Sequence, residues 1–245
     1  MHSFRLLDLT LSSPVENLAL DEALLDDLEE NGHDPILRFW ESDRYFVVLG
    51  RASSLTDDVH VAACRQDHIP VLRRASGGGT ILQGPGCLSY AFVLPISLHP
   101  DLRDIRPTNR FILQRTAKAL QKWQPAIAVQ GVSDLAVEGL KISGNAQRRK
   151  RTALLFHGTI LYGMQAGLIA RYVKHPKRKP DYRGDRHHAA FLSRIDASPH
   201  EMKQAIAEAW HAHVRLDAWP QTRMSCAILN VVERSHPHKL EQSTT

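Results

Sequence analysis

The spacing of apolar residues predicts three helices, two of which begin with a recognisable capping pattern. The letters SPVE at 13–16 are typical of an N-cap serine, a proline in the first turn and a glutamate that closes a capping box. The pair Asn-Gly at 31–32 is expected to end that helix. The letters SPHE at 198–201 repeat the capping pattern, and apolar residues three or four apart predict another helix over about 107–123.

Short apolar runs predict strands, and most of them lie in the middle of the chain. The expected strands are 36–40, 45–50, 69–73, 88–95 and 152–163. The first two of these runs lie on either side of a polar turn, and residues 135–137 and 140–143 are expected to pair as a hairpin around Glu138-Gly139. Strands in the middle, with helices before and after them, predict an α+β fold rather than alternating βαβ units.

Composition narrows the class of protein. The 245 residues are 43% hydrophobic and 23% charged, as in an ordinary soluble protein, which argues against collagen, a coiled coil and a disordered chain. No apolar run approaches the roughly 20 residues needed to cross a bilayer. Three scattered cysteines and the lack of a signal-like start favour a reducing cytoplasm. We expect one domain over 1–234 and a frayed tail over 235–245.

The net charge of +5 is unevenly distributed, because basic residues concentrate at 141–151 and 171–186. Such segments favour an anionic partner, which would be a nucleic acid, a phosphorylated small molecule or an acidic protein. The alternative is a solvated loop with no partner. A nucleic acid is disfavoured as the partner, because aromatic residues are only 7% of the chain and the sequence shows no helical motif of the kind that contacts nucleic-acid bases.

The first candidate for chemistry is a glycine-rich segment that follows a predicted strand. Arg73 and Arg74 come directly before it, and Gly77, Gly78 and Gly79 follow within five residues. Consecutive glycine amides can form an anion-binding concavity, and the arginine fork suits phosphate or carboxylate. No Gly-Lys-Ser/Thr follows, so this is not a P-loop. The alternative is a mobile hairpin loop.

Three other segments carry candidate residues. Lys141 lies beside Gly144 and is expected to share a strand face with Ser143, where its amine could reach a phosphate or an oxyanion. The alternative is a solvated charge on a strand edge. His157 lies in an apolar strand, where a lone histidine is usually a core residue, and Cys87 is either an acyl-accepting thiol or inert packing. No metal site is predicted.

The order of these segments resembles a known family. RRASGGGTILQGPGCLSYAFVLP (73–95), SDLAVEGLKISGNAQRRK (133–150) and LLFHGTILYG (154–163) are similar to the catalytic domain of the lipoate–protein ligase family, which shares a superfamily with biotin ligases and octanoyltransferases. Residues 17–25 and 37–51 resemble that family's opening helix and first hairpin, and the likeness covers about 14–195. The resemblance implies a mixed or antiparallel central sheet flanked by helices.

The resemblance also implies a reaction. ATP and Mg²⁺, as cosubstrates, would activate lipoate to lipoyl-AMP, and the lipoyl group would pass to a lysine of a lipoyl domain, in the glycine cleavage H protein or a 2-oxoacid dehydrogenase E2. No tightly bound cofactor is expected. Lys141 matches the family's lysine, which binds the acyl oxygen and the α-phosphate. The other matching positions that would contact substrate or nucleotide are Arg73, Arg74, Ser76, Gly77, Gly78, Gly79, Gln83, Asp134, Ser143, Gly144, Asn145, His157, Gly158 and Thr159.

Some positions differ from the ligase pattern and leave a second reaction open. Gln83 stands where ligases of this family often have a histidine, and the letters GPGC at 84–87 are similar to the octanoyltransferase branch. Residues 126–132 contain no cysteine, whereas one transferase branch has its nucleophile shortly before the segment that matches 134–139. About 50 residues follow 195, so a separate accessory chain is one expectation. The alternative is transfer of octanoyl or lipoyl from a carrier protein without ATP.

Overall fold

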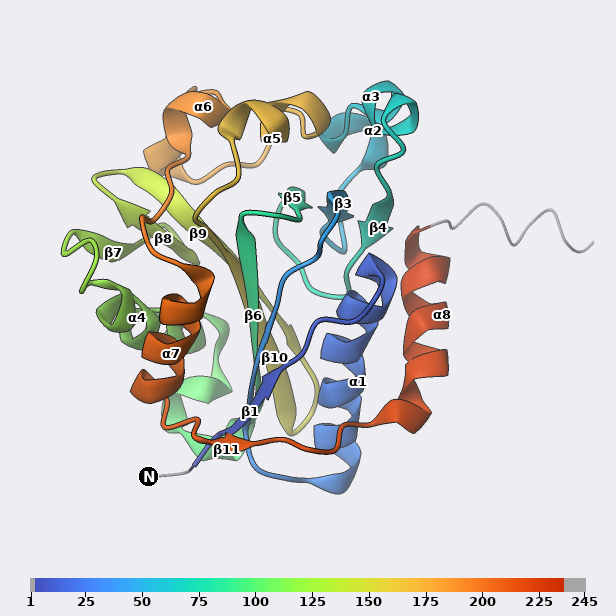
Figure 1. Ribbon diagram of the computed structural model, residues 1–245, viewed down its shortest axis with the longest axis vertical. Coiled ribbons are helices and arrows are strands. Elements are labelled where there is room, and N and C mark those ends of the chain that lie inside the picture. The colour runs from blue at the N-terminus through green and yellow to red at the C-terminus, as the bar shows by residue number, and fades with distance from the viewer. Residues whose placement is uncertain (1–2, 236–245) are drawn as a thin grey trace, which may run out of the picture.

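The computed structural model describes residues 3–235, and within them the chain forms a large mixed sheet covered by helices (Figure 1). The eight strands lie in the order β11-β1-β2-β6-β10-β9-β8-β7. β11, β1 and β2 are parallel, and the others pair antiparallel. The bounds are β1 (Arg5–Asp8), β2 (Ile36–Trp40), β6 (Cys87–Pro95), β7 (Ile127–Gln130), β8 (Asp134–Val137), β9 (Leu140–Arg149), β10 (Ala153–Leu161) and β11 (Val214–Arg215). The predicted α+β class is confirmed.

A second sheet of three strands carries the glycine-rich segment. Its order is β4 (Val71–Arg73), β3 (Phe46–Leu49) and β5 (Ile81–Gln83). The strands at 36–40 and 45–50 exist, but the first hairpin implied by the resemblance is wrong, because β2 pairs with β1 and β6 while β3 pairs with β4 and β5. All four residues of β3 are buried, which suits a central strand with a neighbour on each side. The glycine segment therefore joins two strands that flank β3, and it is not a hairpin loop.

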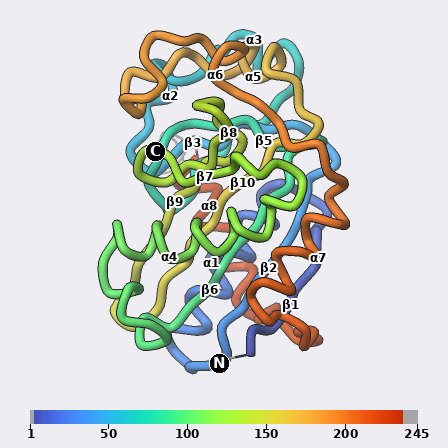
Figure 2. Tube along the Cα trace, turned by 90° about the vertical axis from the view of Figure 1, so that its left-hand side faces the viewer, coloured from blue at the N-terminus to red at the C-terminus, as the bar shows by residue number. Residues whose placement is uncertain are grey.

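Helices cover both faces of the large sheet. α1 (Pro14–Asn31) and α8 (Met224–Ser235) pack together on one face, and α4 (Ile105–Leu120) and α7 (Pro199–Ala209) cover the other (Figures 1 and 2). Both views place the short helices together at one end of the molecule. These are α2 (Leu55–Asp58), α3 (Val61–Gln66), α5 (Ala166–Tyr172) and α6 (His188–Phe191), and 3₁₀ turns lie at Ile96–Leu98, Pro100–Arg103, Asp181–Arg183 and Gln221–Arg223.

The capping patterns predicted both helix starts correctly. The side chains of Ser13 and Ser198 each accept a hydrogen bond from the backbone three residues on, and both capping boxes are complete. Gly32 follows the end of α1 with φ 61°, in the conformation that glycine adopts at little cost. α4 begins and ends two to three residues earlier than predicted. α8 was not predicted; Ser235 is its last residue, and the remainder of the expected tail lies outside the described residues.

The β8–β9 hairpin is confirmed. Glu138 and Gly139 both have positive φ, at 50° and 77°, as a tight two-residue turn requires. β9 continues to Arg149, so most of the first basic segment is a strand rather than a loop. The register of the β8–β9 pairing shifts between Leu135, which pairs with Ser143, and Ala136, which pairs with Lys141. This irregularity interrupts the regular alternation of sheet faces along β9.

Candidate active site

Strand pairing aligns many of the candidate residues in two rows across the sheet face that α1 covers. One row crosses four strands and comprises Ser89, Thr159, Gly144 and Asp134. The next row comprises Ala91, His157 and Ala146. Directly opposed residues of neighbouring strands point to the same face. Side chains far apart in the sequence therefore meet on one surface of the sheet.

The side chain of Lys141 reaches two members of the first row, Asp134 and Gly144. Its Nζ is 2.8 Å from Oδ1 of Asp134, and the hydroxyl of Tyr182 donates to Oδ2 of the same carboxylate at 2.8 Å. A Cβ atom at Gly144 would stand 2.7 Å from Nζ, so a larger residue at this position would displace the amine. The Lys141 side chain is 25% exposed, which means that the amine is held by the protein yet remains reachable.

The glycine-rich segment, here called the glycine loop (Gly77, Gly78 and Gly79), lies beside the Lys141 amine. A Cβ atom at Gly78 would stand 3.5 Å from Cβ of Ala146, so Gly78 lies over β9. Gly144 and Ala146 are two positions apart on one face, a spacing of about 7 Å. The structure thus brings the glycine loop and Lys141 over adjacent positions of one strand, and a group that spans two residues of β9 would contact both.

Arg74 sets the shape of this loop. It is buried, and its guanidinium donates to Oγ of Ser76 at 3.0 Å and to the carbonyl oxygens of Gly77 and Gly79 at 2.6 and 2.8 Å. Burial lowers the pKa of Arg74 to about 10. The loop's carbonyls therefore turn inward toward Arg74. Within residues 3–235, the N–H groups of Gly77, Gly78 and Gly79 have no hydrogen-bond acceptor.

Arg73 donates to backbone carbonyl oxygens near residue 50 and in α8. Its Nη1 donates to the carbonyl oxygens of Gly50 and Ser53 at 2.9 and 2.7 Å, and its Nε donates to the carbonyl of Arg234 at 3.2 Å. The latter carbonyl belongs to the last turn of α8, where a positive charge is favourable. Through Nε and Nη1, Arg73 thus ties the small sheet to α8 and to the segment after β3.

Gln83 connects the two sheets. Its Nε2 donates to Oγ of Ser89 at 3.0 Å, and the side chain is buried. Ser89 stands at the end of the first row, opposite Thr159. Gln83 therefore lies at the margin of the same surface.

Ser143, Asn145 and Gly158 belong to the opposite face. Ser143 pairs with Leu135 and Ile160, both in the core beneath α4 and α7. Asn145 donates to Oγ of Ser143 at 3.1 Å, and a Cβ atom at Gly158 would stand 1.7 Å from Oδ1 of Asn145.

Since Lys141 pairs with Ala136 and Ser143 pairs with its neighbour Leu135, the two side chains fall on different faces. The expectation that Lys141 and Ser143 share a face is therefore wrong. Its physical cause is the register shift between Leu135 and Ala136, which simple alternation along a strand does not include.

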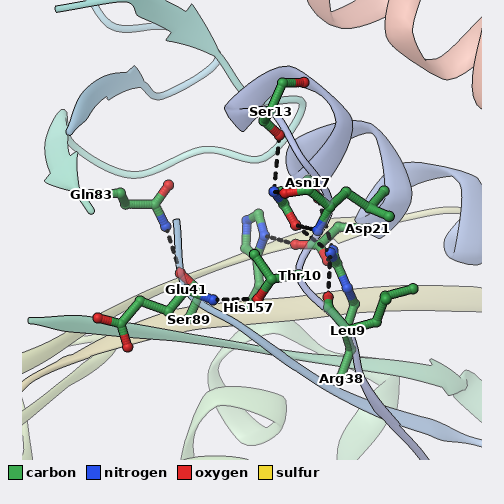
Figure 3. Close-up of polar contacts among 11 residues, drawn as sticks. Leu9, Thr10, Ser13, Asn17, Asp21, Arg38, Glu41, Gln83, Ser89 and His157 are labelled. Atoms are coloured by element: carbon green, nitrogen blue, oxygen red, sulfur yellow. Dashed lines mark hydrogen bonds and ion pairs between the residues drawn. The ribbon is translucent and has the colours of Figure 1, made fainter. Parts of the chain in front are cut away.

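A buried ionic network underlies the glycine loop (Figure 3). Arg38, which is fully buried, donates to Oδ1 of Asp21 at 2.5 Å and to Oδ1 of Asn17 at 2.8 Å. Oδ2 of Asp21 lies 3.4 Å from Nδ1 of His157, whose Nε2 lies 2.6 Å from Oγ of Ser76. Burial alone would raise the pKa of Asp21, but Arg38 and His157 lower it below its ordinary value.

This network was missed from the sequence, although one signal for it is present. Asn17 and Asp21 are four residues apart on α1, between apolar residues that face the sheet. A polar residue that repeats at helical spacing on a buried face needs a buried partner. That partner, Arg38, stands in a strand that reads as purely apolar apart from it.

The basic segments are partly neutralised by acids. Lys150 pairs with Asp26 at 2.7 Å, Arg171 with Asp67 at 2.6 Å, and Lys177 with Asp57 at 3.0 Å. A surface cavity near Thr56, His60 and Lys174 is lined by none of the predicted site residues.

Within residues 3–235 no group of three histidine, cysteine, aspartate or glutamate side chains could hold a metal ion. None of the helices formed by these same residues combines the length and apolar character that a transmembrane segment needs.

Comparison with known proteins identifies relatives. The chain is 28% identical over 166 residues to the Mycoplasma pneumoniae protein named "Probable lipoate-protein ligase A", covering 68% of this chain and 48% of that protein. It is 30% identical over 181 residues to "Octanoyltransferase LipM" of Exiguobacterium sp., covering 64% of this chain and 65% of that one. The chain therefore spans about half to two thirds of these relatives' length.

The fold is also known from solved structures. A bi-partite lipoate protein ligase from Thermoplasma acidophilum, solved in a study of that ligase and its E2 lipoyl domain, superposes with a TM-score of 0.81 at 20% identity over 96% of both chains. The family model "Lipoyl protein ligase A/B catalytic domain" matches residues 13–211, which include every candidate residue. The chain belongs to the lipoyl protein ligase A/B catalytic domain family.

Proposed function

We propose that this protein is a lipoate–protein ligase, which activates lipoate with ATP to lipoyl-AMP and transfers the lipoyl group to a lysine of a lipoyl domain. The observation that carries the proposal is the position of Lys141. Its amine is held by Asp134 over Gly144, next to the glycine loop.

The charge arrangement suits an acyl phosphate. Both half-reactions place growing negative charge on the acyl and phosphoryl oxygens, so fixed donors lower both barriers. Lys141 supplies a cation on one side, and the N–H groups of Gly77, Gly78 and Gly79, which have no acceptor within residues 3–235, supply dipoles on the other. The apolar tail of lipoate would lie against apolar strand residues, as in most ligand sites.

The proposal includes the cosubstrates and partners. ATP and Mg²⁺ would be cosubstrates, and no tightly bound cofactor is required. The acceptor would be the lipoyl domain of a glycine cleavage H protein or of a 2-oxoacid dehydrogenase E2, in the cytoplasm. A separate accessory chain is a further part of the proposal, supported by the likeness to a bi-partite lipoate protein ligase.

The test is a ligation assay with the purified chain, lipoate, magnesium ATP and an apo lipoyl domain. We expect release of pyrophosphate and a mass gain of one lipoyl group on the acceptor. An acceptor whose target lysine is replaced by arginine serves as the control and should gain no mass. If neither pyrophosphate nor modified acceptor appears, ligation by this chain alone is refuted.

A second candidate is acyl transfer from a carrier protein without ATP. Two observations favour it: the likeness to octanoyltransferase LipM and the GPGC letters at 84–87. An octanoyl-carrier thioester offered in place of lipoate and ATP distinguishes the two reactions, because only a transferase would modify the acceptor from that donor.

We expect Cys87→Ser to keep acyl transfer within about threefold of the wild-type rate, because a thiol must ionise to act as a nucleophile. Cys87 is 1% exposed, and burial raises its pKa to about 12. The rate of acceptor modification is the measurement, and Cys226→Ser, on the exposed side of α8, is the matched control. Complete loss of transfer in Cys87→Ser alone would establish a thioester route.

A further inference from the structure

Ser76, His157 and Asp21 form a hydrogen-bonded chain that links the glycine loop to α1. Oγ of Ser76 is 2.6 Å from Nε2 of His157, and Nδ1 of the same ring is 3.4 Å from Oδ2 of Asp21. Ser76 and Asp21 are buried, at 1% and 2% exposed, and His157, at 14%, is the most exposed of the three. Figure 3 shows Arg38 and His157 approaching the Asp21 carboxylate from different sides.

The neighbouring groups determine which atoms carry the hydrogens. Arg74 Nε donates to Oγ of Ser76 at 3.0 Å, and an arginine cannot accept a hydrogen bond. Asp21 accepts from Arg38, and its lowered pKa keeps it ionised, so it accepts from His157 as well. Nδ1 of the neutral ring therefore carries the hydrogen, and Nε2 has a lone pair that accepts the Ser76 hydroxyl.

This hydrogen-bonded chain lies beside the surface on which acyl transfer is proposed. His157 stands directly opposite Ala146, and Ala146 is the residue over which Gly78 lies. The two oxygens of Asp134 are already engaged by Lys141 and Tyr182. His157 can act as a base only through Nε2, because its Nδ1 faces the Asp21 carboxylate, which would stabilise the ring once it has taken up a proton.

We propose that Ser76 and His157 remove the proton from the acceptor lysine's amine during acyl transfer, with Asp21 as a positioning residue. This inference rests on the acyl transfer in the proposed function, and it applies to either acyl donor. The amine nitrogen bonds to the acyl carbon, its proton moves to Oγ of Ser76, and the Ser76 proton moves to Nε2 of His157. The bond from the acyl carbon to the leaving group then breaks, and the leaving group, AMP or a carrier thiol, keeps the electron pair. His157 afterwards returns the proton to the thiolate or to water.

The test compares two nucleophiles on a preformed acyl donor, so that the ATP step is bypassed. Chemically prepared octanoyl-adenylate is offered to the full chain with an apo lipoyl domain or with hydroxylamine. The adduct of hydroxylamine loses its proton to water readily, because hydroxylamine is a much weaker base than lysine. We expect His157→Gln to lower transfer to the lipoyl domain by about 100-fold and hydroxylaminolysis by less than about threefold. Ser76→Ala should likewise lower transfer to the lipoyl domain far more than it lowers hydroxylaminolysis.

The controls separate a proton relay from a structural role. His99→Gln, at a histidine that stacks on Phe111 outside the site, should leave both rates unchanged. Thermal melts establish that each variant is folded. Equal loss with both nucleophiles, or full lysine transfer by His157→Gln, would overturn the relay.

The failure of the inference is distinguishable from that of the proposed function. Normal transfer from the adenylate without pyrophosphate release from ATP refutes only the ligase. No transfer by the wild-type chain from either the adenylate or an octanoyl-carrier thioester refutes the relay together with acyl transfer.

Discussion

Replacing Lys141 with alanine is expected to lower the rate of acyl transfer by about 100- to 1000-fold, the usual effect of removing a charge-stabilising donor from a site of this kind. The amine is aligned by Asp134 and passes over Gly144, so no neighbouring side chain takes its position. The fold should remain intact, because the buried Asp134 carboxylate keeps its hydrogen bond from the Tyr182 hydroxyl when the amine is removed. Single-turnover transfer from preformed acyl-adenylate and a thermal melt measure the two effects.

Lys150→Ala is the matched control. Lys150 also ends in an ion pair, with Asp26, and its side chain is 29% exposed, close to the 25% of Lys141. It lies beyond the end of β9, and among the described residues its amine pairs with Asp26 rather than with a candidate residue, so its removal should leave the transfer rate unchanged. If Lys141→Ala turned over normally, the site would have to lie elsewhere on the chain.

Local signals in the sequence were sufficient for most secondary structure, because each depends on neighbouring residues. The capping boxes at Ser13 and Ser198 and the turn at Glu138-Gly139 are examples. Strand partnership was less predictable. No local feature of the sequence indicates that β3 pairs in a second sheet rather than with β2. Its pairing depends on the residues that pack against β3 from both sides, which are distant in the sequence.

The candidate site shows the same division between local and long-range information. The order of motifs located Lys141, Asp134 and the glycine loop, which the structure brings together. The sheet face predicted for the Ser143 side chain was wrong, because a register shift in the pairing with the neighbouring strand β8 determines that face. The direction of Arg73 depends on carbonyls near residue 50 and on α8, a helix that was not predicted.

We expect Asp21→Ala to destabilise the protein by about 3–5 kcal/mol, because it leaves the Arg38 guanidinium buried without its carboxylate. That is a large part of the 5–15 kcal/mol by which domains are typically stable. Chemical denaturation measures the loss. Asp27→Ala is the control on the same helix: Asp27 is 24% exposed and pairs with Arg223, so its removal should cost less than about 1 kcal/mol.

A double variant and a pH series show whether the buried charge is the cause. Asp21→Leu combined with Arg38→Met should recover most of the lost stability, because an apolar pair of similar volume avoids the cost of burying ions. Arg38 and His157 outweigh burial and lower the pKa of Asp21, so the native protein binds this proton less tightly than the unfolded chain. The stability from Asp21 is therefore present above its unfolded pKa and is lost as the pH falls. The double variant should lose less stability than the wild type on acidification, whereas equal slopes would mean that this pair contributes nothing to acid sensitivity.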